Sequence, residues 1–246
     1  MTDQSKNATY RLTQVEAVIR ALFEGPYRDA ADKVILDANL DANLDANLDP
    51  KFFHRVRRML QIDRQHGIKI GSKLSEHPMA FFDEVPEGKG HPVRFTPHKA
   101  FNLVIACELL RFGFDQREAV EAVGIVDAGL HEAFDRSIDF LETAAWMKGF
   151  TFQNGEEAAD LRWFLLMTGV IMPPGTAEKS GGMFRDGERI PSLEVVQGER
   201  YAMKRLLALS NERLQAIGVL ELSHLAVRVA ELLPLQREKR PGRPPK

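Results

Sequence analysis

Residues 92–124, PVRFTPHKAFNLVIACELLRFGFDQREAVEAVG, are the stretch that decides how this chain folds. Thr96 stands where an N-cap belongs and Pro97 follows at the first helical position, so the pair predicts a helix start. Gly113 stands where a residue in the left-handed conformation would end that helix. Apolar residues recur at helical spacing between these ends, namely Phe101, Ile105, Leu109 and Phe112. The stretch therefore predicts a short strand followed by a largely apolar helix.

A second helix is expected directly after the first. Asp115 and Glu118 have the spacing of a capping box, and Gly124 stands where we expect this helix to end. Its apolar residues can pack it back onto the first helix: Phe114, Ala119, Val120 and Val123. The two helices are therefore predicted to form one folded unit.

The composition is that of an ordinary globular protein. The chain has 246 residues, of which 44% are hydrophobic and 28% charged, and its net charge is −2. The single cysteine, Cys107, excludes an internal disulfide and a thiolate zinc site, and its apolar neighbours predict a core residue. No apolar run is long enough to span a bilayer or to serve as a signal peptide. We therefore expect a cytoplasmic protein without membrane partners.

Residues 36–49 repeat the tetrapeptide Leu-Asp-Ala-Asn. Alternating Asp and Asn raises the possibility of a calcium loop, which needs glycine at its sixth position and glutamate at its twelfth. Counted from Asp37, those positions hold Ala42 and Leu48. Asp and Asn also disfavour a helix interior. We therefore interpret the repeat as a solvated insertion between helices.

The next expected helix, at 51–67, is strongly basic. Asp63 is the only acid between residues 51 and 73. His54 adds polar reach to the basic residues of this segment, which are Lys51, Arg55, Arg57, Arg58, Arg64, Lys69 and Lys73. A solvated helix face is one interpretation of such a run. The other is contact with DNA, because Arg and Lys on one helix supply phosphate contacts and bidentate readout of guanine.

Two short apolar segments, 79–85 and 92–95, follow the basic helix. Gly88 and Gly90 permit a turn between them, which would place Lys89 near the tip of a β-hairpin with Arg94 in its second strand. A basic helix followed by a hairpin with a cationic tip is typical of a winged helix-turn-helix. In that fold the helix enters the major groove while the wing contacts the backbone or the minor groove.

Three segments of the chain resemble the MerR family of DNA-binding regulators. They are Arg94-Phe95-Thr96 leading into a helix, the run CELLRFGF at 107–114 with the acidic helix after it, and YRLTQV at 10–15. The resemblance implies that residues 10–124 form a winged helix-turn-helix that reads DNA. The family's Tyr-Tyr pair after the recognition helix is absent, and the repeat at 36–49 makes the first half of this unit longer than in the family.

Beyond residue 126 the pattern alternates between helix and strand. A helix is predicted at 127–148, strands at 150–152, 161–172 and 183–190 with an Asp186-Gly187 hairpin turn, and helices near 198–216 and 220–233. The first part of 161–172 fits equally well as the end of a helix that begins at Glu156. Leucine-rich terminal helices favour a homodimer, although simple core packing explains them equally well. The expected fold class is mainly α with a small β component. Its predicted domains are a winged-helix unit at 1–125, an α+β oligomerisation or regulatory unit at 126–236, and a disordered basic tail at 237–246.

The basic tail, REKRPGRPPK, resembles an AT-hook, which lies in the minor groove of A·T-rich DNA. Gly242, Arg243 and Pro244 match the core of that motif, but Pro241 stands where its first arginine belongs. The cations expected to contact DNA are Lys239, Arg240, Arg243 and Lys246. A solubilising end is the alternative interpretation.

No pattern typical of catalysis appears in the sequence, which lacks H-E-x-x-H, G-x-S-x-G and phosphate-loop spacings. His91 and His98 lie seven apart without a nearby third ligand, so no metal or cofactor is predicted. We expect a sequence-specific, non-enzymatic protein that binds double-stranded DNA, a bacterial transcriptional regulator associated with the nucleoid. The alternative is an interaction or scaffold protein that binds no nucleic acid, and an enzyme such as a nuclease ranks third.

Overall fold

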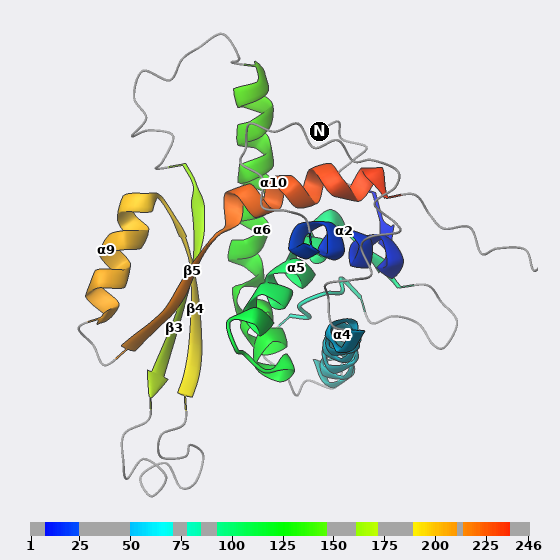
Figure 1. The fold of residues 1–246 in the computed structure, drawn as a ribbon, viewed down its shortest axis with the longest axis horizontal. Coiled ribbons are helices and arrows are strands. Elements are labelled where there is room, and N and C mark those ends of the chain that lie inside the picture. The colour runs from blue at the N-terminus through cyan, green and yellow to red at the C-terminus, as the bar shows by residue number, and fades with distance from the viewer. Residues whose placement is uncertain are drawn as a thin grey trace, which may run out of the picture.

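A computed structural model describes residues 8–24, 50–70, 78–84, 93–146, 161–171, 189–210 and 214–236. The described chain is mainly helical with a small antiparallel sheet, as the sequence predicts (Figure 1). Its first half contains β1 (Tyr10–Arg11), α2 (Leu12–Glu24), α4 (Pro50–Ile70), β2 (Arg94–Phe95), α5 (Pro97–Arg111) and α6 (Gln116–Trp146). Its second half contains β3 (Trp163–Ile171), β4 (Arg189–Gln197), α9 (Glu199–Ser210), β5 (Leu214–Glu221), α10 (Leu222–Leu232) and the 3-10 turn η1 (Leu233–Leu235).

Helix α5 begins and ends where the sequence predicts. The Thr96 hydroxyl accepts from the backbone N–H of Lys99 at 3.3 Å. At the other end Gly113 has φ of 91°, and the N–H of Phe114 donates to the carbonyl of Leu109 at 3.1 Å. This left-handed ending uses a conformation that glycine adopts without strain.

Helix α5 is also the centre of the main core. It is buried around nearly its whole circumference, and α6 and α10 pack against it. The prediction that Cys107 is a core residue is confirmed, since its thiol is fully buried. A helix that is buried on nearly all sides needs other elements to enclose it. The remaining helices are arranged to do so.

Helix α6 departs from the prediction, because it is one continuous helix where two were expected. Asp115 and Glu118 form the predicted capping box, with Asp115 Oδ1 accepting from the Glu118 N–H at 2.8 Å. Gly124, however, lies inside the helix, and a Cβ there would approach the carbonyl oxygen of Pro78 to 3.0 Å. This glycine therefore permits close packing and does not end the helix. Helix α6 continues across residues 125 and 126, where the sequence analysis places the boundary between the first two predicted domains. That boundary stays a prediction.

The sheet has the strand order β4-β3-β5 and is covered on both faces (Figure 1). Helix α6 packs against β4, where a Cβ on Gly129 would lie 3.1 Å from the Cβ of Val195, and α9 covers the opposite face. Side chains of β3 alternate between these layers. Trp163 and Leu165 face the main core, and Phe164 and Leu166 face α9. The predicted strand at 161–172 is thus confirmed as a central strand.

Residues 214–221 correct a second prediction. The sequence favoured helix near 198–216 and 220–233, but α9 ends at Ser210 and the chain returns as strand β5 before α10. The pairing of β5 with β3 shifts by one residue between Met167 and Thr168, which leaves Ile217 unpaired in a bulge. Gly218 follows the bulge, where a Cβ would lie 2.8 Å from the ring of Phe112. Strand β5 therefore packs directly against the end of α5.

The hairpin predicted from 79–85 and 92–95 is not formed by the described residues. Residues 78–84 are irregular, and β2 pairs with β1 instead, with Tyr10 opposite Phe95. The backbone N–H groups of Ala80 and Phe81 are held by a side chain of α4, which leaves them unable to join a strand ladder. Residues 85–92, the tip of the predicted wing, lie outside the described residues.

Several other predictions also fall outside the described residues. These are the repeat at 36–49, the strand at 150–152, the Asp186-Gly187 turn and the basic tail at 237–246. In the described part of the chain, no helix has both the length and the apolar character needed to cross a membrane.

Candidate functional site

Helix α4 has one buried and one exposed face. Phe52, Val56 and Met59 belong to the main core, and the Phe52 ring lies 6.0 Å from that of Phe23 on α2. The residues opposite this buried face are all exposed and recur at helical spacing: Lys51, His54, Arg55, Arg58, Gln61 and Gln65. We call these six residues the α4 stripe. They form a continuous polar surface that carries positive charge and no carboxylate.

The predicted DNA contacts on α4 divide into two groups. Lys51, His54, Arg55 and Arg58 belong to the stripe, and Arg58 Nη1 donates to Gln61 Oε1 at 2.7 Å. Arg57 and Arg64 lie on the flank, and Arg57 Nε forms an ion pair with Glu16 on α2 at 3.1 Å. This pair ties α2 to the side of α4. Arg57 is exposed like the residues of the α4 stripe, but it differs from them in joining two helices.

Asp63, the only acid of α4, points into the protein. It is fully buried, and its carboxylate accepts from the N–H of Ala80 at 2.9 Å and of Phe81 at 2.8 Å. Burial raises the pKa of Asp63, while these two backbone N–H groups oppose the shift. Because this charge is withdrawn from the surface, the exposed face of α4 carries only basic and neutral groups.

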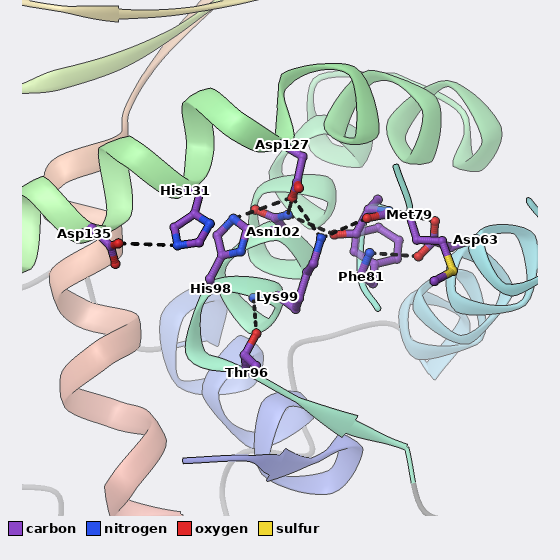
Figure 2. A network of polar contacts seen from close by, with 11 residues as sticks. Asp63, Met79, Phe81, Thr96, His98, Lys99, Asn102, Asp127, His131 and Asp135 are labelled. Carbon is purple, nitrogen blue, oxygen red and sulfur yellow. Dashed lines mark hydrogen bonds and ion pairs between the residues drawn. The ribbon is translucent and has the colours of Figure 1, made fainter. Parts of the chain in front are cut away.

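A buried polar network continues from residues 79–81 to α5 and α6 (Figure 2). Lys99 Nζ donates to the carbonyl of Met79 at 2.9 Å and to Asp127 Oδ1 at 3.0 Å. Asn102 Nδ2 donates to the carbonyl of Ala80 at 2.9 Å and to the same carboxylate oxygen at 2.6 Å. Asp127 on α6 therefore neutralises a buried ammonium and fixes the segment that Asp63 holds from the other side.

Two histidines extend this network at the start of α5. The rings of His98 and His131 stack with centroids 4.1 Å apart, and His131 Nε2 lies 3.3 Å from Asp135 Oδ2. His98 Nε2 lies 3.6 Å from Asp127 Oδ1, beyond hydrogen-bonding distance. Burial, with the nearby His131, lowers the pKa of His98 to about 4 against the opposing effect of Asp127. His98 is therefore neutral at physiological pH.

A pocket of about 310 Å³ opens beside the stacked histidines. Its walls come from the start of α5, from the middle of α6 and from Asp83. Phe134 and Ile138, both nearly fully buried, form its apolar side. In the part of the chain that the structure describes, no group of three or more potential ligands could hold a metal ion. The pocket lining thus combines carboxylates, two imidazoles and an apolar side.

The remaining predicted DNA contacts are placed less completely. Arg94 on β2 is exposed, and its Nη1 donates to the Thr9 hydroxyl at 3.2 Å. The tail follows Gln236, whose carbonyl accepts from Gln14 Nε2 at 2.7 Å near the start of α2. The other predicted contacts are not described. Of Lys69 only the side chain lies outside the described part of the chain, and six residues lie outside it entirely: Lys73, Lys89, Lys239, Arg240, Arg243 and Lys246.

The sequence interpretation missed the buried network and its pocket. His98, Lys99 and Asn102 interrupt the apolar pattern of α5 within its first two turns, and such polar residues in a buried helix were the available signal. The hydrogen-bond partners of Lys99 and Asn102 lie between 20 and 28 residues away in the chain. Distances of that kind cannot be read from helical periodicity.

No family model matches the chain, and neither a characterised protein nor a solved structure gives a significant match. Function therefore has to be inferred from the chain's own side chains, above all the α4 stripe and the buried network beside it.

Proposed function

We propose that this chain is a sequence-specific, non-enzymatic DNA-binding protein, a transcriptional regulator of bacterial type, and that the α4 stripe is its DNA-reading surface. The observation that carries the proposal is the charge arrangement on α4. Its exposed face holds Lys51, Arg55 and Arg58, while its only carboxylate, Asp63, is fully buried. A helix of 21 residues with such a face can lie in the major groove, which is wide enough to admit a helix.

The chemistry of the stripe fits base readout as well as phosphate contact. Arg58 and Arg55 present guanidinium groups that can bind the O6 and N7 atoms of guanine, and Lys51 supplies a phosphate contact. Gln61 and Gln65 carry amides of the kind that bind adenine through N6 and N7. In the free protein, Arg58 is already hydrogen-bonded to Gln61. This bond limits the conformational freedom that Arg58 has left to lose on binding.

Two further observations support the proposed DNA-binding function. The pairing of β1 with β2 brings together Tyr10 and Phe95, which belong to two of the three segments that resemble the MerR family. The bond between Gln14 and Gln236 holds the residue that precedes the basic tail next to α2. A tail tethered to the unit that carries the α4 stripe can add affinity, because its DNA contact becomes intramolecular.

Dimerisation belongs to this proposal, although only part of the leucine-rich helices is available for it. Leu232 of α10 is buried in the chain's own core. A homodimer would use α9, where Leu207 is exposed together with Tyr201 and Met203. A dimer presents two reading helices to the two half-sites of a palindromic operator.

The test is a mobility-shift titration of the full chain against genomic DNA fragments at two salt concentrations. Replacing Arg55 and Arg58 together by Ala should weaken binding to the preferred fragment about 10- to 100-fold and flatten the salt dependence, because phosphate contacts release counterions. The matched control replaces Arg117 and Arg136, two exposed arginines of α6, together by Ala. It should bind the same fragment with an affinity within about twofold of the native chain. The proposal fails if the native chain does not bind at low salt, or if both double variants bind alike.

A further inference from the structure

The pocket beside the stacked histidines has an unbalanced charge. Three carboxylates line it, those of Asp83, Asp127 and Asp135, against the single ammonium of Lys99. That ammonium is already used, because it donates to Asp127 Oδ1 at 3.0 Å and to the Met79 carbonyl at 2.9 Å. The pocket therefore offers negative charge to a ligand, chiefly from Asp83 and Asp135, which both line it.

The pocket wall also contains a buried polar side chain without a hydrogen-bond partner. Of the residue His98 only 8% is exposed, and its Nε2 makes no hydrogen bond within the described residues. Its ring stacks on that of His131, so the two imidazoles form a flat aromatic wall. Phe134 and Ile138 complete an apolar surface beside the carboxylates. An unsatisfied buried polar group, a carboxylate rim and an apolar wall together are features of a ligand site.

We propose that this pocket binds a small organic ammonium ion with an apolar group, and that its occupancy alters DNA binding by α4. The ammonium group lies between Asp83 and Asp135, where charge-assisted hydrogen bonds to carboxylates are strong. The apolar group lies against Phe134 and Ile138. The second part of this inference, control of α4, rests on the proposed function, whereas the ligand site itself does not.

A continuous chain of contacts joins the pocket to α4 (Figure 2). Asp127, which lines the pocket, holds Lys99 and Asn102, and these two side chains hold the carbonyls of Met79 and Ala80. The N–H of Ala80 is in turn bound by Asp63 on α4. A ligand that shifts Asp127 thus acts on the segment that α4 grips. Any effect of the ligand on DNA affinity must be matched by an equal effect of DNA on ligand affinity.

The site is tested by isothermal titration calorimetry of the full chain, without DNA, at neutral pH and with a chelator present. The probe is phenethylamine, and phenylacetate and 2-phenylethanol are its anionic and neutral counterparts. Phenethylamine should bind at least about tenfold more tightly than either counterpart, since the carboxylates favour a cation. Asp135→Asn should weaken its binding about tenfold, and Glu132→Gln, at an exposed acid of the same helix outside the pocket, should leave it unchanged.

Asp83→Asn is the second variant, because Asp83 is exposed and lies outside any helix. Equal binding of the three probes, or equal binding by the native chain and both pocket variants, overturns the site. The regulatory part is measured by adding phenethylamine to the mobility-shift titration. A change of threefold or more in DNA affinity is expected for the native chain, and a smaller change is expected for Asp135→Asn at the same phenethylamine concentration. If phenethylamine binds but DNA affinity does not change, only the regulatory part is overturned. If the native chain does not bind DNA at all, the proposed function is overturned, and the calorimetry still decides whether the ligand site exists.

Discussion

The helical region and the outer layer of the sheet are stabilised in different ways. The helical region comprises β1 to α6 together with α10, and it buries an extensive apolar core around α5. The outer layer, formed by α9 and the sheet face beneath it, has a second cluster whose buried members among the described residues are Phe164, Leu166, Val196 and Ala202. All buried polar or charged residues of the described chain belong to the helical region, and these are Gln14, Asp63, His98, Lys99, Asn102 and Ser137.

This difference indicates which part of the chain tolerates buried polar groups. Burying an amide or a charge costs free energy unless each group finds a partner, and only a large core has apolar contacts enough to offset that cost. The outer layer is too thin for this, and its helix leaves Tyr201, Met203 and Leu207 exposed. We therefore expect the outer layer to open first in local unfolding, whereas the helical region retains its polar network until global unfolding.

The comparison can be tested most directly with one leucine from each region. Leu109 on α5 is fully buried in the main core, and Leu206 on α9 is only partly buried against the second cluster. Leu109→Ala should lower the free energy of unfolding by about 3–4 kcal/mol, because it leaves a cavity in a close-packed site. Leu206→Ala should cost about 1 kcal/mol, since less apolar surface is lost. Urea denaturation followed by circular dichroism measures both, and equal losses would contradict the comparison.

The sequence predicted both ends of α5 and the start of α6 correctly, because the signals at these positions are local. Thr96 and Gly113 bound α5 through contacts within a few residues of each end, and Asp115 caps α6 in the same way. The prediction that Gly124 ends a helix is wrong, because a glycine that ends a helix and a glycine that allows close approach of a neighbouring backbone look identical in the sequence. The carbonyl of Pro78, which explains this glycine, lies 46 positions earlier in the chain.

Strand β5 was missed for a related reason. The predicted helices contain Leu214 in one and Leu220 in the other, and short apolar segments do not distinguish helix from strand. Residues 214–221 form a strand because the backbone groups at the edge of β3 pair with them, across a bulge at Ile217. On the candidate site, the basic residues of α4 were identified from composition alone. The buried side of the same helix, with Asp63 bound to a segment 17 residues away, required the structure.

Asp63 provides the second test, within the helical region. Asp63→Asn should lower the free energy of unfolding by about 2 kcal/mol, because the amide offers one acceptor oxygen where two buried N–H groups require partners. Asp83→Asn serves as the control, since this carboxylate belongs to the irregular segment 78–84 but is exposed. Thermal or urea denaturation of both variants gives the comparison. If Asp63→Asn costs no more than Asp83→Asn, the buried network does not hold the segment in place.

The smallest expected effect is on the pH dependence of the free energy of unfolding. In the helical region part of this dependence comes from His98. Its pKa is about 4 in the folded chain against 6.5 for an unperturbed histidine, so between these values the unfolded chain binds more protons. Stability is therefore unaffected by this group above pH 6.5 and falls as the pH is lowered toward 4, by about 1 kcal/mol at pH 5.5. The groups that face His98 are Asp127, which favours its protonation, and His131 and Lys99, which oppose it, and all three remain in a His98→Phe variant.

His98→Phe should therefore lose this part of the pH dependence while keeping a ring against His131. His224→Phe, at an exposed histidine of α10, is the matched control and should retain the acid sensitivity of the native chain. Urea denaturation at pH 7 and at pH 5.5 measures the difference for each protein. Because the other titrating groups contribute equally to all three proteins, a pH dependence in His98→Phe as steep as in the native chain would mean that the helical region does not hold His98 in its neutral form.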